Sequence, residues 1–204
     1  MKEDLVCLHT TSASRRLILL HGWGADAEDL IPFGEIIHEG LKGQEIVEIV
    51  SLRAPLSHPG GLGKQWYSLF PPDWTEANKA VDDLQLRLES LSNDNISIEQ
   101  SAIMGFSQGG AMALASGLQL PFAGVIACSA YPHPNLSIPD KIPPVFLSHG
   151  TNDEIVPCLA MQNIADLIKD NGFNAETELF VGGHEIPNQI ILKIVQTLSE
   201  WFAL

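Results

Sequence analysis

Short apolar runs alternate with segments of helical period along this chain, and this alternation constrains its fold more than any other feature. Six runs rich in apolar and β-branched residues predict strands at 16–21, 45–52, 101–105, 123–128, 144–149 and 176–181. Several are apolar at every position, which is typical of parallel strands covered on both faces. The sequence therefore predicts an α/β fold with a mostly parallel central sheet and helices on both faces.

Four segments between these runs have the apolar spacing of helices. Their apolar positions are Leu30, Phe33, Ile37 and Leu41; Val81, Leu84, Leu88 and Leu91; Met161, Ile164 and Ile168; and Ile190, Ile194 and Leu198. Asp26 is the predicted N-cap of the first helix, Pro157 and Pro187 lie in the first turns of the last two, and Gly172 ends the third. Because ligands in such folds bind at the carboxyl ends of the strands, functional side chains are expected directly after them.

The charge balance narrows the class of partners. The 204 residues include 11 Lys and Arg against 25 Asp and Glu, a net charge of −14, and the carboxylates are spread along the chain. Such a surface repels nucleic acid and anionic lipid, so we expect neither as a partner. The length suits one domain, and we assign residues 1–204 to a single domain.

Cysteine usage and the N-terminus favour a cytoplasmic location. Cys7, Cys128 and Cys158 are an odd number of cysteines without C-x-x-C spacing, which is typical of a reducing compartment. The chain begins with acidic residues where a signal peptide has basic ones. The uncharged stretch 100–139 is interrupted by Gly and Pro, so it predicts buried strands and a helix, and we expect no integral membrane association.

Ser107 lies in a G-x-S-x-G motif, Gly105-Phe106-Ser107-Gln108-Gly109, between a predicted strand and a run of helix formers. A nucleophile in this context sits on a strained turn, and a side chain at either flanking glycine would crowd the strand or the helix. The motif predicts Ser107 as a nucleophile. The alternative is a glycine-rich turn whose serine only caps the next helix.

His184 and Asp153 follow the motif in the order Ser, Asp, His that this nucleophile turn requires. His184 comes directly after the last predicted strand, and a neutral imidazole can accept the serine proton and return it to a leaving group. Asp153 follows the preceding strand and would orient the imidazole. A helix-capping role is the alternative for Asp153, and a structural loop role is the alternative for His184.

The same chemistry needs donors for an oxyanion. Leu20-His21-Gly22-Trp23-Gly24 ends an early strand, and the backbone N–H groups of Trp23 and Gln108 are the predicted donors. A simple glycine turn is the alternative. No metal-ligand spacing includes His21 or His149, and no phosphate-binding glycine motif is present, so we expect neither a metal nor another cofactor.

These motifs, together with Arg53-Ala54-Pro55, Trp66-Tyr67 and Val156-Pro157, resemble the phospholipase/carboxylesterase family, which includes the acyl-protein thioesterases. The resemblance runs from about His21 to the C-terminus. It implies an α/β-hydrolase fold without a large lid, with Ser107, Asp153 and His184 as the triad and Trp23 and Gln108 as oxyanion donors.

Some positions depart from the thioesterase pattern. That branch usually has Leu where Trp23 stands and often Asp where Ser68 stands, whereas the Gly183-His184-Glu185-Ile186-Pro187 ending is similar to the bacterial carboxylesterases. The connection from Arg53 to Trp74 is the candidate pocket wall or flap, with Trp66 and Tyr67 lining an acyl site. Ordinary core packing of these two aromatics is the alternative.

We therefore expect a serine carboxylesterase that cleaves carboxylic esters or thioesters through an acyl-enzyme on Ser107. Its partner would be a small-molecule substrate. A lysophospholipase or acyl-protein thioesterase acting on long acyl chains of a lipid or protein is one alternative, and a catalytically silent binding protein of the same fold is another. Assembly as a homodimer stays open.

Overall fold

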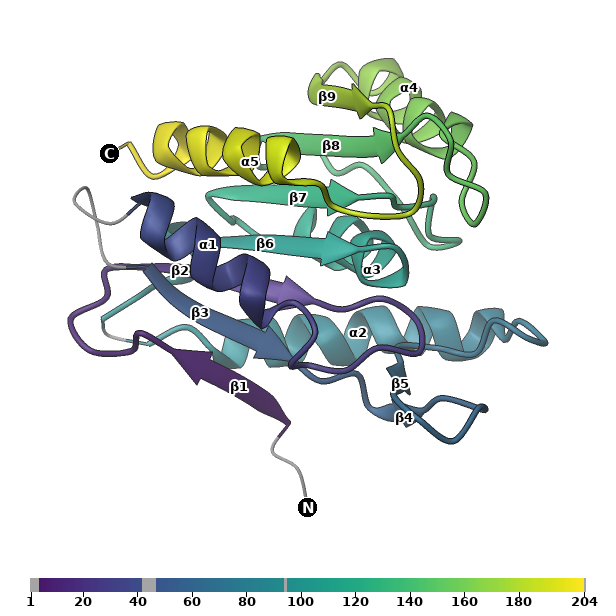
Figure 1. Cartoon of the computed structure of the whole chain (residues 1–204), viewed down its shortest axis with the longest axis horizontal. Helices are drawn as coiled ribbons and strands as arrows, with labels where there is room; N and C mark the ends of the chain where they lie inside the picture. The colour runs from purple at the N-terminus through teal and green to yellow at the C-terminus, as the bar shows by residue number, and fades with distance from the viewer. Residues whose placement is uncertain (1–3, 42–46, 94, 204) are drawn as a thin grey trace.

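A seven-stranded sheet forms the centre of the computed structural model, which describes residues 4–41, 47–93 and 95–203 (Figure 1). The strands lie in the order β1-β3-β2-β6-β7-β8-β9. Their bounds are β1 Leu5–Leu8, β2 Arg15–Leu20, β3 Val47–Leu52, β6 Ser101–Phe106, β7 Gly124–Cys128, β8 Val145–Gly150 and β9 Ala175–Phe180. All neighbours pair in parallel except β1, which runs antiparallel to β3 at one edge.

The six predicted strands are confirmed within one or two residues, although positions 45 and 46 of the second lie outside the described residues. The sequence did not reveal β1 or the small hairpin of β4 (Leu56–Ser57) and β5 (Lys64–Gln65). All three are short, and β1 is only partly buried at the sheet edge, so none has the continuous apolar run by which the central strands are found.

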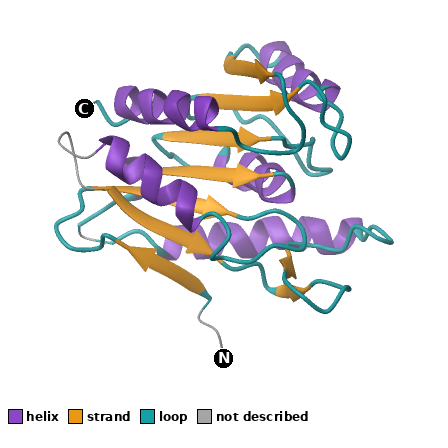
Figure 2. Cartoon of the chain, in the orientation of Figure 1, coloured by secondary structure: helices purple, strands orange, loops and turns teal. Residues whose placement is uncertain are grey.

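Five α-helices cover the two faces of the sheet in the described part of the chain (Figure 2). Their bounds are α1 Ile31–Leu41, α2 Trp74–Ser90, α3 Gln108–Gly117, α4 Leu159–Asp170 and α5 Asn188–Trp201, and a short 3₁₀ turn, η1, spans Ile98–Gln100. Within β2, Ile18 and Leu20 pack toward α2, α3 and α4, whereas Leu17 and Leu19 pack toward α1 and α5. Burial on both faces explains why the strand is apolar throughout.

The helix ends differ from the predictions in places. Asp26 does not cap α1, because residues 26–30 form turns of their own and the helix starts at Ile31. Pro187 is the N-cap of α5 rather than a first-turn residue, and Pro157 precedes Cys158, the N-cap of α4. These two are shifts of one or two residues.

The predicted end of α4 is confirmed. Gly172 has φ +86°, its N–H donates to the carbonyl of Lys169, and the N–H of Phe173 donates to that of Ile168. This is the pattern in which a left-handed glycine closes a helix. Within the described residues, every helix is too short or too polar to cross a bilayer.

Candidate active site

Ser107 occupies a strained turn between β6 and α3. Its backbone angles are φ 54° and ψ −118°, and it is the N-cap residue of α3. A Cβ built on Gly105 would lie 2.1 Å from the carbonyl oxygen of Gly109, and one on Gly109 would lie 2.1 Å from that of Leu20. The two glycines therefore let helix and strands approach closely enough to hold Ser107 in this conformation.

Asp153 and His184 form the hydrogen-bonded pair predicted from their order in the chain. His184 Nδ1 donates to Asp153 Oδ2 at 2.7 Å, and the Asp153 side chain is fully buried. The other carboxylate oxygen accepts from the backbone N–H groups of Ile155 and Val156. Asp153 thus fixes its own loop with one oxygen and the imidazole with the other, and it does not cap α4.

The same contacts set the charge of this carboxyl. Burial alone would raise the pKa of Asp153, but the hydrogen bonds from His184, Val156 and Ile155 and the charge of His184 together lower it. The carboxyl is therefore ionised at neutral pH, and it can stabilise an imidazolium.

The imidazole of His184 lies beside the nucleophile turn. The ring centroids of Phe106, the residue before Ser107, and His184 are 4.7 Å apart. Among the described residues, no hydrogen bond joins Ser107 to His184, so that bond stays a prediction. Catalytic hydrogen bonds often shorten only when substrate is bound.

His21 fixes the loop that carries the first predicted oxyanion donor. Its ring is fully buried; Nε2 accepts from the Ala54 N–H at 3.1 Å, so Nδ1 carries the proton and donates to the Gly22 carbonyl at 2.8 Å. Because C=O and N–H of one peptide point in opposite directions, this bond also sets the direction of the Trp23 N–H. A Cβ on Gly22 would lie 3.5 Å from the Ser107 Cβ, so the loop abuts the nucleophile.

The two predicted oxyanion donors are available. Within the residues that the structure describes, neither the Trp23 nor the Gln108 backbone N–H donates to a protein acceptor. Gln108 begins α3, so its N–H is one of the unpaired groups at a helix N-terminus. The geometry is compatible with an oxyanion hole, which stays a prediction.

Trp66 and Tyr67 are almost fully buried, with exposed fractions of 1% and 0%, and Trp66 also lines a pocket of about 270 Å³ beside Ala80 and Leu84 of α2. The Trp66 indole donates to the His21 carbonyl at 2.9 Å, and the Gln108 side-chain amide accepts from the Trp66 N–H and donates to the Tyr67 carbonyl. These contacts favour the core-packing alternative for Tyr67. They also tie the nucleophile turn to the oxyanion loop. The lining of the pocket at Trp66 includes none of Ser107, Asp153 and His184, and an acyl-site role for Trp66 stays a prediction.

Sequence reasoning missed the supporting roles of His21 and His149. His149 is buried on β8, its Nε2 lies 2.8 Å from the Val156 carbonyl and 3.3 Å from Asp153 Oδ2, and it thereby supports the acid loop. The available signal was their shared position, each directly before a glycine at a strand end. Among the described side chains, no group of three His, Cys, Asp or Glu residues is arranged to hold a metal ion.

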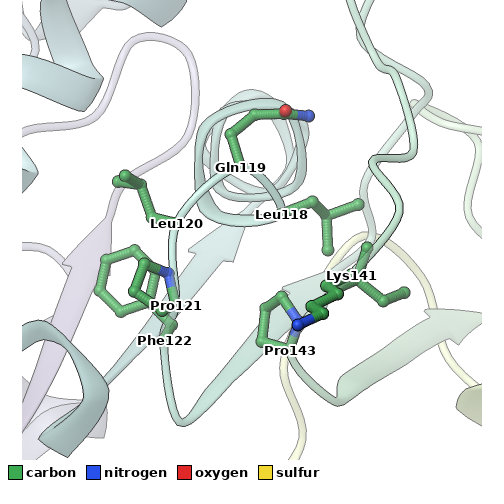
Figure 3. A pocket seen from close by; sticks show the side chains of 8 residues that line it. Leu118, Gln119, Leu120, Pro121, Phe122, Lys141 and Pro143 are labelled. Carbon is green, nitrogen blue, oxygen red and sulfur yellow. The ribbon is translucent and has the colours of Figure 1, made fainter.

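A pocket of about 380 Å³ opens beside His184. Its walls are Leu30, Phe33, Phe106 and Ile186, and its remaining lining is His21, Gly22, Ala25, Asp29, His184 and Glu185. A second pocket of about 380 Å³ lies at the amino ends of β7 and β8, away from the strand ends that carry the predicted triad. Its lining includes Leu118, Phe122, Lys141 and Pro143 (Figure 3). Only the first adjoins the triad.

Comparisons with known proteins identify the family and the fold of this chain. The family model described as Phospholipase/Carboxylesterase matches residues 3–202. Acyl-protein thioesterase 1 of Neurospora crassa is 32% identical over 141 residues, and the match spans 58% of this chain and 58% of that protein. The probable carboxylesterase SOBER1-like of Arabidopsis thaliana is 30% identical over an alignment of 215 positions, and the match spans 93% of this chain and 79% of that protein. The crystal structure of esterase PE8 matches with a TM-score of 0.84 and 27% identity over 96% of each chain, which confirms the predicted α/β-hydrolase fold without a large lid.

Proposed function

Because the chain belongs to the phospholipase/carboxylesterase family, we propose that it is a serine hydrolase that cleaves carboxylic esters or thioesters. The observation that carries the proposal is the hydrogen bond between Asp153 and His184 beside the strained turn of Ser107. Relatives named as carboxylesterases and acyl-protein thioesterases support the reaction class.

Ser107, His184 and the two backbone N–H groups have separate roles in the proposed hydrolysis. His184 accepts the proton of Ser107 Oγ as that oxygen forms a bond to the substrate carbonyl carbon, and the carbonyl oxygen becomes an oxyanion facing the Trp23 and Gln108 N–H groups. His184 then gives the proton to the leaving alcohol or thiol as its bond to carbon breaks. Water, deprotonated by His184, then attacks the acyl carbon, and His184 returns the proton to Ser107 Oγ as the bond between Oγ and the acyl carbon breaks and the acid leaves.

Replacing Ser107 with Ala tests the proposal. We expect turnover of a short activated ester to fall by about 10⁶-fold, because the residual rate comes from binding and the oxyanion hole alone. A fluorophosphonate probe followed by mass spectrometry should label Ser107 in the parent protein. Absence of labelling in folded protein, together with no ester turnover by the parent protein, would favour the catalytically silent binding protein. Near-parental turnover by the variant would refute Ser107 as the nucleophile.

A second candidate acts on long acyl chains, as a lysophospholipase or acyl-protein thioesterase. The relative named acyl-protein thioesterase 1 favours it, whereas Trp23 and Ser68 stand where that branch usually has other residues. Rates on esters of increasing acyl length separate the two, since a short-ester hydrolase loses kcat/KM as the chain grows. We also propose a cytoplasmic location, supported by an odd number of cysteines without C-x-x-C spacing.

A further inference from the structure

The pocket beside His184 has an apolar wall and an acidic rim. Its apolar side chains are Leu30, just before α1, Phe33 in the first turn of α1, Phe106 before Ser107 and Ile186 before Pro187. The carboxylates of Asp29 and Glu185 also line it, and both residues are exposed. Of the described residues that form this lining, none is Lys or Arg.

The carboxylates of Asp29 and Glu185 accept hydrogen bonds from backbone N–H groups, and the ion pairs of Arg53, which follows β3, are with other carboxylates. Asp29 Oδ2 accepts from the Asp26 N–H at 2.6 Å, and Glu185 Oε1 accepts from the Gly183 N–H at 3.3 Å. The Arg53 guanidinium is paired with Asp26 and Glu28 instead. The pocket therefore keeps a negative potential at its mouth.

The position of the pocket relative to His184 determines which part of the substrate the pocket binds. The imidazole must give its proton to the leaving oxygen or sulfur, so that atom and the group attached to it lie against the His184 ring. His184 is itself part of the pocket lining, and Phe106 joins the ring to the nucleophile turn. The pocket thus continues from the leaving-group side of the reaction centre.

We propose that this pocket binds the leaving alcohol or thiol and selects groups with an apolar body and a neutral or cationic end against anionic ones. The inference rests on the proposed function. A charge about 5 Å from one carboxylate in a water-like dielectric changes binding roughly four-fold, so two carboxylates give on the order of ten-fold discrimination. Salt should reduce it, because the Debye length falls to about 3 Å at 1 M.

Three acetate esters test the selection. Their alcohols share a two-carbon spacer and end in tert-butyl, trimethylammonium or carboxylate groups. At low salt we expect kcat/KM for the carboxylate ester to be about ten-fold below that of the tert-butyl ester, with the trimethylammonium ester equal to or above it. The gap should narrow at 1 M salt. A mirror series with the charge on the acyl side should show a smaller effect.

Asp29→Asn is the decisive variant, since an amide oxygen can still accept from the Asp26 N–H. It should lower the ratio of kcat/KM for the tert-butyl ester to that for the carboxylate ester about three-fold. Glu185→Gln should act in the same direction. Asp82→Asn, which removes an exposed carboxylate on α2 outside the pocket, is the matched control and should change none of the ratios.

The outcomes separate the two proposals. If Ser107 is labelled and all three esters react at equal rates, or if the discrimination follows acyl-side charge only, the pocket assignment is wrong while the serine hydrolase stands. If no ester reacts and Ser107 resists the fluorophosphonate, the proposed function itself is wrong.

Discussion

Replacing His21 with Ala should separate catalysis from stability in the oxyanion loop. The change removes the 2.8 Å bond to the Gly22 carbonyl and leaves the buried Ala54 N–H without its acceptor. An unsatisfied buried donor costs about 1–3 kcal/mol, and the vacated ring volume adds to that, so we expect the free energy of unfolding to fall by about 2–4 kcal/mol.

The catalytic effect follows from the peptide that His21 orients. Complete loss of one oxyanion donor lowers kcat about 10²–10³-fold. In the variant the Ala25 N–H still donates to the Gly22 carbonyl at 3.3 Å, so the peptide is loosened rather than freed. We therefore expect kcat to fall roughly 10- to 100-fold with KM within about three-fold, since the donor acts on the transition state.

A second buried histidine supplies the control. His38 on α1 also bonds a backbone carbonyl, that of Val47 at 2.9 Å, but it packs near His9 and away from the triad. His38→Ala should lose stability with little change in kcat. Urea unfolding and steady-state kinetics, below the unfolding range of both variants, provide the two readouts. Loss of stability without loss of kcat in His21→Ala would refute the positioning role.

Two further changes test the acid and the nucleophile turn. Asp153→Asn should lower kcat about 10⁴-fold by disturbing the imidazole tautomer. Because folding lowers the pKa of Asp153, its carboxylate stabilises the fold at pH values above the unfolded-state pKa near 3.8. In acid titrations, the free energies of unfolding of parent and variant should therefore converge as pH falls through the folded-state pKa. Gly109→Ala should cost about 3 kcal/mol or prevent folding, because its Cβ would meet the Leu20 carbonyl, whereas Gly183→Ala, with 4.0 Å to its nearest neighbour, should keep parental stability in thermal melts. Parental stability in Gly109→Ala would contradict the close approach.

The sequence predicted what depends on local pattern. Continuous apolar runs located the buried parallel strands. The order of Ser107, Asp153 and His184 after three strand ends predicted the pairing of Asp153 and His184, which the structure joins by a hydrogen bond of 2.7 Å. Both results follow because parallel strands deliver their carboxyl ends to one edge of a sheet whatever the exact packing.

Features that depend on contacts between distant segments could not be predicted in the same way. Trp66 is buried because its indole reaches the carbonyl of His21, 45 positions earlier, and Gln108 completes the same network from a third segment. Nothing local distinguishes a buried aromatic of this kind from one that lines a pocket. The N-cap prediction for Asp26 was wrong for a similar reason. The local pattern suits an N-cap, but residues 26–30 form turns before α1 begins.

Backbone contacts between loops hold Asp153 and His184 in place, and contacts of this kind are compatible with a fold shared with esterase PE8 at 27% identity. The loops of Asp153 and His184 are joined by bonds from the Thr151 N–H to the Phe180 carbonyl at 2.8 Å and from the Asn152 N–H to that of Gly182 at 2.9 Å. Gly150 permits this approach, since its Cβ would lie 2.2 Å from the Gly183 carbonyl. Because side chains enter these contacts little, surrounding residues can diverge while the pair keeps its geometry. Under the pocket proposal, substrate selection falls to side chains around the pair, including the acidic rim beside His184.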